Sequence, residues 1–439
     1  MTPEIIGGWL LVALVASIFV GFPIAFTLII LGLGFGYWGF GDTVFHLLLF
    51  QTFATMKEQT LAQVPLFIFM GLLLERAGLM ERLFLVMQKM FGGLNGSLYL
   101  SAMFVATLFG AASGIAGASV TLLGIMAARS MDRSKYDVRL SAGIITSGGT
   151  LGILIPPSVM LVVMGPVMGV PVTDLYAGAL IPGVMLAAMY AAYALIRCYL
   201  NPSLGPALPP EERAASVSST LIEFAKGMIP ISVLLMCSLG AILGGVATPT
   251  EGAALGAFGS LTLVILYRRL TWPLLYNSVL KTIEVSCMIL FLVAASNFFG
   301  GVFSRLGTPE VLSQALLSLE LNKYVILLII MAAIFLLAWP LEWVPIVLIF
   351  VPIVLPMVKQ LGFDMTWFAI LIAVNLQTAW LSPPVALSAY FLKGVAPQWQ
   401  LSDIYMGMLQ FMMIQLVGLA LVMAFPQLVL WLPGVLYGK

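Results

Sequence analysis

Two pairs of adjacent prolines interrupt long apolar stretches of this chain. Pro156-Pro157 and Pro383-Pro384 lie 227 residues apart, each inside a stretch that is otherwise apolar enough to cross a membrane as a helix. Proline removes a backbone donor and clashes with the preceding turn, so each pair leaves carbonyl groups without helical partners. Hydrocarbon cannot satisfy such carbonyls, whereas a bound cation or a water-lined cavity can. Paired interruptions in the two halves of a membrane chain indicate the binding site of a secondary transporter.

The composition places the chain in a lipid bilayer. Of its 439 residues, 62% are hydrophobic and 8% are charged; the mean hydropathy is +1.11. These values exclude an ordinary soluble domain. The formal net charge of +1 provides no basic face for nucleic acid. Cys198, Cys237 and Cys287 are widely spaced, which fits packing residues better than disulfides or a metal site. The first residues lack a secretory signal pattern, so we expect the first helix to be retained.

The two halves share more than the proline pairs. Three further pairs of motifs recur 226 to 229 residues apart and in the same order: Gly21–Pro23 with Thr248–Thr250, Arg76–Gly78 with Arg305–Gly307, and Thr173–Gly178 with Ser402–Gly407. Such a constant offset indicates an internal duplication. We expect a first repeat at 1–200, a polar, proline-rich cytoplasmic linker at 201–226 and a second repeat at 227–439.

Runs of about 20 apolar residues, the length that spans a bilayer, divide each repeat into five expected crossings. In the first repeat they are 4–20, 23–40, 61–78, 139–165 and 174–197; in the second they are 228–246, 249–267, 283–302, 366–392 and 404–432. The fourth crossing of each repeat is broken, near Pro156 and Pro383. Segments 43–56 and 271–281 are expected to lie on the membrane surface. Segments 98–128 and 323–359 are expected to form re-entrant hairpins, the second turning at Trp339–Trp343.

An odd number of crossings requires the second repeat to have the opposite orientation to the first. With both termini outside the cell, fourteen of the Lys and Arg residues fall in cytoplasmic segments and five in outer ones. This distribution satisfies the positive-inside rule. We therefore expect an all-α polytopic membrane protein of two inverted-topology repeats, with the first hairpin entering from the cytoplasm and the second from outside.

Two opposed hairpin tips that meet two broken helices form a pocket near the membrane midplane, where helix N-termini favour anions and unwound carbonyls bind cations. This arrangement suits an anion that is carried with sodium. The expected anion-binding residues are Ser113, Gly114, Gly149, Thr150, Glu342, Trp343, Asn375 and Thr378. The expected sodium ligands, partly through carbonyls, are Ser113, Gly117, Gly149, Gly152, Pro156, Leu341, Thr378, Leu381, Ser382 and Pro383.

Several of these residues have a structural alternative. The small residues, such as Gly149, can serve close helix packing alone. Glu342 is an intramembrane acid and so a functional candidate, or it is a solvated turn residue. Glu251 stands in the first turn of a helix, where a carboxylate meets the helix dipole favourably without any further role. His46, the single histidine, lies on an expected surface helix and is interfacial rather than catalytic.

Five motifs in order resemble the large membrane subunit of the tripartite ATP-independent periplasmic (TRAP) transporters, the DctM-like large permease. They are Gly21–Phe26, Pro65–Gly71, Ile155–Ser158, Ala247–Glu251 and Asn375–Pro384. The match spans essentially the whole chain. The resemblance implies a sodium-driven importer of organic anions in the bacterial or archaeal inner membrane, which works with a four-helix small membrane subunit and a periplasmic substrate-binding protein.

The resemblance also implies an elevator mechanism of the ion transporter superfamily type. Helices at 4–60, 174–197, 228–281 and 404–432 then form a static scaffold, and elements at about 61–165 and 283–392 move as one block. Two positions depart from the family pattern. Ile115 follows Ser113-Gly114 where members often have a second serine, and Ser382 stands where many have threonine. The Pro340–Trp343 tip resembles a branch that carries 2-oxo acids and other small carboxylates, such as C4-dicarboxylates.

Two other classes of protein remain to be compared. A self-sufficient ion-coupled anion carrier or antiporter has the same broad architecture and needs no binding protein. A membrane-embedded enzyme needs clustered catalytic groups, which one histidine and scattered cysteines do not supply. We therefore expect no catalytic residues, no organic cofactor, and Na⁺ as the coupling ion.

Overall fold

The computed structural model describes residues 2–213, 217–318, 321–339, 341–383 and 386–438, and these residues form helices and no strands. Pro340 and Pro384, which the sequence analysis assigned to a hairpin tip and to a proline pair, lie outside the described residues. Six helices are long and apolar enough to cross a membrane, and a seventh crossing results if the pair α4 and α5, bent by 56°, is one span. The chain is thus a multi-pass, all-helical membrane protein.

The first half of the chain contains the expected hairpin and broken helix. Its helices are α1 (Pro3–Val20), α2 (Ile24–Phe40), α3 (Thr43–Lys57), α4 (Gln63–Arg76), α5 (Leu79–Phe91), α6 (Ser97–Ser113), α7 (Ala116–Leu123), α8 (Arg129–Arg133), α9 (Val138–Thr150), α10 (Val159–Met168) and α11 (Val172–Leu200). A 3₁₀ turn at Gln59–Ala62 precedes α4, and a π turn at Gly124–Ala128 joins α7 to α8. The segment between α9 and α10 is the first break.

The second half follows a related order. Its helices are α12 (Val217–Leu235), α13 (Ala241–Leu243), α14 (Pro249–Leu266), α15 (Trp272–Arg305), α16 (Thr308–Leu317), α17 (Lys323–Leu337), α18 (Trp343–Pro345), α19 (Val351–Gln360), α20 (Met365–Leu381), α21 (Leu387–Val395), α22 (Leu401–Ala424) and α23 (Gln427–Tyr437). The segment between α20 and α21 is the second break.

Aspartates fix the start of both broken helices. The side chain of Asp137 accepts a hydrogen bond from the Leu140 amide at 2.8 Å, and that of Asp364 accepts one from the Trp367 amide at 2.9 Å. Each satisfies one of the four amides that a helix N-terminus leaves without partners. Glu251 has a similar role, because it forms a reciprocal capping box with Thr248 at the start of α14. The structural alternative for Glu251 therefore accounts for its contacts.

Four sequence expectations are wrong at the level of helices. The expected surface helix at 271–281 and the expected crossing at 283–302 form one helix, α15. A threonine cap and a proline start this helix at 271–273, and an ion pair between Lys281 and Glu284 stabilises it where the two expected segments meet. The helix α5 follows Gly78, whose φ is +70°, and its charged residues hid it from a search for apolar runs. The expected helix 404–432 is interrupted at Phe425-Pro426, and α12 begins at Val217 rather than at 228.

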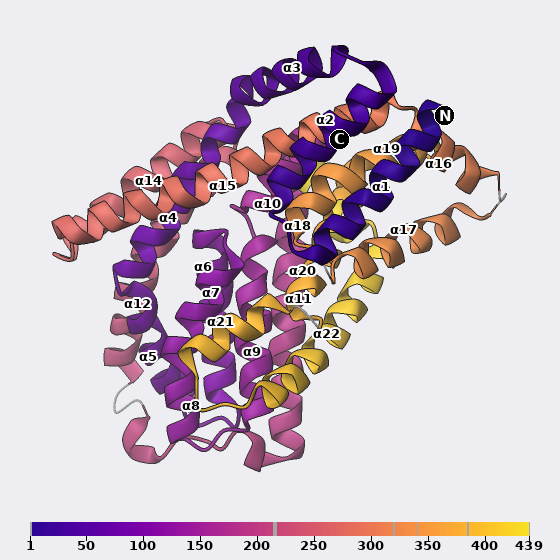
Figure 1. Ribbon diagram of the computed structural model, residues 1–439. Coiled ribbons are helices and arrows are strands. Elements are labelled where there is room, and N and C mark those ends of the chain that lie inside the picture. The colour runs from indigo at the N-terminus through magenta and orange to yellow at the C-terminus, as the bar shows by residue number, and fades with distance from the viewer. Residues whose placement is uncertain (1, 214–216, 319–320, 340, 384–385, 439) are drawn as a thin grey trace.

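The two broken helices lie at the centre of the molecule. Every residue of α20 from Trp367 to Leu381 is buried, as is every residue of α9 from Leu140 to Thr150. Figure 1 shows α15 as a long rod that crosses the molecule, and this helix packs against α2, α3 and α4. The N-terminal helices and the C-terminal end of α15 share a second, smaller apolar core around Leu10, Leu28 and Phe298.

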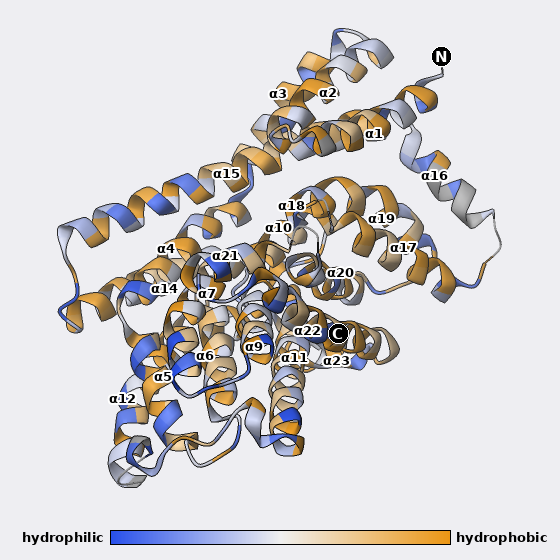
Figure 2. Cartoon of the chain, turned by 60° about the horizontal axis from the view of Figure 1, so that its bottom comes forward, coloured by the Kyte–Doolittle hydropathy of each residue, from blue (hydrophilic) through white to orange (hydrophobic). Residues whose placement is uncertain are grey.

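Apolar residues also cover much of the outer surface, as Figure 2 shows for α1, α2 and α15. Large side chains such as Trp9, Phe26, Trp38 and Phe258 are more than half exposed. In water this would be unfavourable, but lipid chains solvate such a surface. The cysteines divide accordingly: Cys198 is buried, whereas Cys237 and Cys287 are exposed, so the packing interpretation applies to Cys198 alone.

Candidate functional site

The tip of the first hairpin packs directly against the first helix break. The hairpin consists of α6 and α7 with a turn at Gly114, whose φ of +63° favours glycine. A Cβ atom on Gly114 would lie 3.0 Å from the carbonyl oxygen of Pro157, and one on Gly110 would lie 3.1 Å from Cα of Gly152. Small residues on both sides thus allow backbone to touch backbone at this point.

Two hydroxyl groups and a cap complete this side of the site. Ser113 Oγ and Ser119 Oγ lie 3.0 Å apart, and both are within 4 Å of the position that a Cβ atom on Gly152 would take. Ser158 caps α10 with its Oγ and also donates to the carbonyl of Ile153 across the break. Pro156 lies in the break, and the Pro156–Pro157 peptide bond is cis.

Three other residues expected here have different neighbours. Gly149 packs against Val120, where an added Cβ would be 2.9 Å from the backbone nitrogen. Gly117 faces the ring of Phe391 on α21 rather than the first break. The hydroxyl of Thr150 donates to the Ser147 carbonyl of its own helix at 2.7 Å. Both glycines thus pack closely against a neighbouring side chain, and Gly117 also lines the groove described below.

Polar groups also gather at the second break. The Ser382 amide donates to the Thr378 carbonyl at 2.8 Å, but Ser382 Oγ is buried and has no hydrogen-bond partner among the described residues. Thr378 Oγ donates to the Asn375 carbonyl. Asn375 donates to the Met331 carbonyl of α17 at 2.8 Å, while its Oδ1 also lacks a partner in the described part of the chain. Leu381 is buried, and Pro383 follows Ser382 in the break.

A cavity of about 120 Å³ brings the two hairpin tips together. It is lined by Gly114 and Ile115 of the first tip, by Glu342 and Trp343 of the second, and by Ile153, Val285, Met288 and Trp380, among others. Glu342 and Trp380 also line an adjoining cavity of about 180 Å³, which includes Leu341. The structure thus places residues from five separate segments of the sequence around one space.

The central cavity continues into a larger groove of about 660 Å³. Ile115, Val285, Met288, Glu342 and Trp380 line both. The groove extends to Glu75 and Arg76 at the end of α4 and to Lys281 and Glu284 on α15, and the last two form an ion pair of 2.9 Å. These four charged side chains provide a polar route between the surface and the central cavity.

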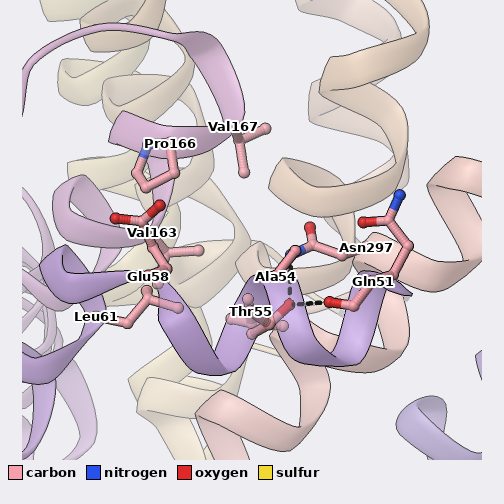
Figure 3. Close-up of a pocket in the computed structure, with 10 residues that line it drawn as sticks. Gln51, Ala54, Thr55, Glu58, Leu61, Val163, Pro166, Val167 and Asn297 are labelled. Atoms are coloured by element: carbon pink, nitrogen blue, oxygen red, sulfur yellow. Dashed lines mark hydrogen bonds between the residues drawn. The ribbon is translucent and has the colours of Figure 1, made fainter. Parts of the chain in front are cut away.

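A further pocket of about 210 Å³ lies between the end of α3, the helix α10 and the helix α15 (Figure 3). The amide of Asn297 donates to Thr55 Oγ at 3.0 Å, and Thr55 Oγ donates to the Gln51 carbonyl at 2.9 Å. Glu58 accepts from the hydroxyl and the amide of Thr60. Sequence reasoning missed this pocket, although Asn297 within an apolar helix was a signal of a polar contact.

No cluster of three or more His, Cys, Asp or Glu side chains that could hold a metal occurs among the described residues. The groups that fit a monovalent cation are therefore neutral oxygens. Ser382 Oγ and Asn375 Oδ1 are buried without partners in the described ranges, and hard cations prefer such oxygen ligands. Buried polar atoms of this kind are costly unless a ligand or water satisfies them.

Comparisons with known proteins agree on one family. The family model described as "Tripartite ATP-independent periplasmic transporter, DctM component" matches residues 11–428. The isethionate TRAP transporter permease protein DctMQ of Oleidesulfovibrio alaskensis is 29% identical over 377 residues, 85% of this chain, and the chain spans 58% of that protein's length. The sialic acid TRAP transporter large permease protein SiaM of Vibrio cholerae is 28% identical over 436 residues, which are 98% of each protein.

A solved structure shows a similar fold. The YdaH transporter of Alcanivorax borkumensis matches with a TM-score of 0.65 and 14% identity, over 97% of this chain and 98% of that one. At this identity the likeness concerns the fold alone. The curated relatives are permease proteins rather than enzymes.

Proposed function

Because this chain belongs to the DctM component family of the tripartite ATP-independent periplasmic transporters, we propose that it moves a small organic anion across the inner membrane together with sodium ions. The permeases named above carry isethionate and sialic acid, both organic acids, according to their names. The substrate class that we propose for this chain is a small carboxylate, such as a C4-dicarboxylate or a 2-oxo acid.

The observation that carries the proposal is the cavity between the two hairpin tips. Both tips and α20 contribute to it, and it continues into a groove with charged side chains. A solute that crosses the membrane needs such a space, with backbone irregularities confined to its walls. In this proposal the anion contacts the first tip at Ser113 and Gly114 and the second tip near Trp343, with Asn375 and Thr378 behind it.

Sodium would bind at the two helix breaks. At the second break the unpartnered Ser382 Oγ and the carbonyls around Leu381 and Pro383 offer oxygens. At the first break, Ser113 Oγ lies beside Gly152, and Pro156 follows in the same break. One positive charge at each break lowers the electrostatic cost of placing an anion between them, because opposite charges in a medium of low dielectric attract strongly. Sodium binding and anion binding would therefore support each other.

We also propose the assembly and the movement that this family implies. A small membrane subunit and a periplasmic substrate-binding protein complete the transporter, and the latter delivers the anion. The hairpins and broken helices would move as one block against helices such as α1, α2 and α14. The two repeats would have opposite orientations in the membrane. One hairpin would then close the site toward each side of the membrane.

Reconstitution tests this proposal directly. The purified chain and its small subunit are placed in proteoliposomes, and the binding protein is added outside with its radiolabelled ligand. Uptake should require an inward sodium gradient and should cease when the gradient is collapsed. Sodium-independent accumulation would contradict sodium coupling. Uptake of the same rate without the binding protein would favour the self-sufficient carrier instead.

A further inference from the structure

A chain of four buried polar groups connects the two helix breaks. The side-chain amide of Gln377 donates to the Thr150 carbonyl at 3.3 Å, and its carbonyl oxygen accepts from the amide of Gln415 at 2.5 Å. Gln415 also donates to the Val374 carbonyl at 2.8 Å, and its own oxygen accepts from the hydroxyl of Tyr190 at 2.7 Å. The side chains of Gln377, Gln415 and Tyr190 are fully buried.

The Gln377 side chain links its own helix, which leads to the second break, to the end of the helix at the first break. Thr150 is the last residue of α9, and a 3₁₀ turn at Leu151–Ile153 leads from it into the first break. Gln377 itself lies on α20, next to Thr378 and five residues before Ser382 at the second break. Residues that are 227 positions apart in the chain are therefore joined through one side chain.

Such a network is costly to disturb. A buried amide that loses its partner pays the cost of desolvation without compensation. The network also consists of groups that are neutral near pH 7, so its state there depends on geometry rather than on protonation. When a ligand shifts the end of α9 or of α20, Gln377 must either follow or lose a hydrogen bond, and the shift is thus transmitted to the other break.

We propose that Gln377 is a positioning residue that couples the two helix breaks, so that occupation of one break by sodium raises the affinity of the other. The inference rests on the proposed function, in which both breaks bind sodium. Coupling of this kind is reciprocal and typically changes affinity by about 5- to 150-fold. Gln415 and Tyr190 support Gln377 by holding its carbonyl end.

Substitution of Gln377→Met keeps the length of the side chain and removes both hydrogen bonds. In the reconstituted complex, wild-type uptake should depend on sodium with a Hill coefficient above 1. The variant should show a Hill coefficient near 1 and a half-saturating sodium concentration raised about fivefold or more. The KM for the anion at saturating sodium should stay close to that of the wild type. Loss of folded protein would lower only the maximal rate, and it would leave the Hill coefficient and the half-saturating sodium concentration unchanged.

The helices α11 and α22, which carry Tyr190 and Gln415, also provide a matched control. Gln410 on α22 accepts from the hydroxyl of Tyr193 on α11 at 2.8 Å, as Gln415 does from Tyr190. It also accepts from Arg197, and among the described residues these hydrogen bonds of Gln410 do not reach either break. Gln410→Met should leave the sodium dependence unchanged. If Gln377→Met does not fold, Gln415→Met tests the same link from its other side and should shift sodium dependence in the same direction.

The outcomes separate the two proposals. Sodium-independent uptake by the wild type would overturn the proposed function and this inference with it. Cooperative sodium dependence in the wild type, with the same Hill coefficient in Gln377→Met and Gln415→Met, would overturn the inference alone. An equal change of the Hill coefficient and of the half-saturating sodium concentration in the Gln410→Met control would also overturn the inference, because such a change would reflect the packing of α11 against α22 in general.

Discussion

At the scale of single residues, glycine determines how closely the central helices approach. A Cβ atom on Gly407 of α22 would lie 2.0 Å from the Arg139 carbonyl oxygen, a backbone atom of α9 that cannot rotate away. By contrast, an added Cβ on Gly34 of α2 has no other atom within 4 Å. The same residue type is therefore indispensable at one position and replaceable at the other, and no local pattern in the sequence distinguishes them.

We expect Gly407→Ala to destabilise the protein by about 1–3 kcal/mol, because overpacking forces the backbones of α9 and α22 apart. Gly34→Ala should be neutral or stabilising by roughly 0.5–1 kcal/mol, since alanine loses less conformational entropy in a helix. Thermal unfolding of the detergent-purified variants, followed by tryptophan fluorescence, measures both. Equal midpoints for the two variants would contradict the proposed close contact.

A hydroxyl group at the second break leads to another prediction. Ser382 Oγ has no partner among the described residues, whereas Thr378 Oγ is already bonded within its helix. Ser382→Ala should therefore raise the sodium concentration for half-maximal uptake more than Thr378→Val does. The variant that lacks both hydroxyls should need a higher sodium concentration than either single variant. The amount of inserted protein should not fall.

Ser296 serves as the control for this measurement. Its hydroxyl on α15 is also buried and has no partner in the described part of the chain, but it lines neither the central cavity nor the groove. Ser296→Ala should leave sodium activation unchanged. Normal sodium activation in the Ser382 variant as well would remove this residue from the proposed sodium site.

At the scale of elements, the sequence predicted where helices are interrupted better than where one helix continues through a polar segment. The proline pairs located both breaks, and Asp137 and Asp364 mark the starts of the broken helices. The continuity of α15 could not be predicted, because the polar segment around Lys281 reads as a surface helix until its ion pair with Glu284 is seen. Likewise, the charges of α5 hid a helix whose apolar face is buried against its neighbours.

The residues of the candidate site could be predicted where they lie together in one short segment of the sequence. Ser113, Gly114, Glu342 and Trp343 were expected at the tips. Gly114, Glu342 and Trp343 line one cavity, whereas Ser113 lies beside Ser119 and Gly152. Gln415 was not expected, because its importance depends on Gln377, which is 38 residues away. Gly117 and Gly149 were also expected at the site, and their assignment as sodium ligands stays a prediction; positions for added Cβ atoms on them lie next to Phe391 and Val120, and Gly117 lines the groove. Helix periodicity does not reveal which face meets which partner.

An element-scale clamp joins the first hairpin to the loop that follows α21. The carboxylate of Asp132 on α8 accepts from the indole of Trp399 at 2.7 Å and from the amide of Gln398 at 2.6 Å. Asp132→Ala should cost about 1–3 kcal/mol, since it leaves the partly buried indole without its acceptor. Hydrogen exchange in residues 396–400 should accelerate. Arg133→Ala, on the neighbouring exposed residue, should leave this exchange unchanged, and equal rates in all three proteins would contradict the clamp.

At the scale of the whole molecule, one end of the protein collects the basic residues. The linker binds there: the Gly96 amide donates to the Gly205 carbonyl at 2.8 Å, and the Leu208 amide donates to the Gly92 carbonyl at 2.9 Å. The base of the first hairpin and the start of α9 lie at the same end, with Lys89, Arg129 and Arg139 nearby in sequence. Figure 1 shows α5 and α8 at this end, whereas α16, α17 and α19 lie at the opposite one.

From the positive-inside rule we expect the basic end to be cytoplasmic, and cysteine labelling tests this orientation together with the inverted repeats. The parent protein carries Cys237→Ser and Cys287→Ser and retains only the buried Cys198. Gly93→Cys and Lys359→Cys are each added to it, because both positions are exposed and a Cβ on Gly93 meets no other atom within 4 Å. An impermeant maleimide should label Lys359→Cys in intact spheroplasts and should label Gly93→Cys only after permeabilisation.

The parent should react in neither condition, since Cys198 is fully buried. Labelling of Gly93→Cys alone in intact spheroplasts would indicate that the protein has the opposite orientation in the membrane, with the repeats still inverted. Labelling of both positions from the same side would place the bases of the two hairpins on one face of the membrane. Each repeat would then cross the bilayer an even number of times, and a block closed by opposed hairpins could not form.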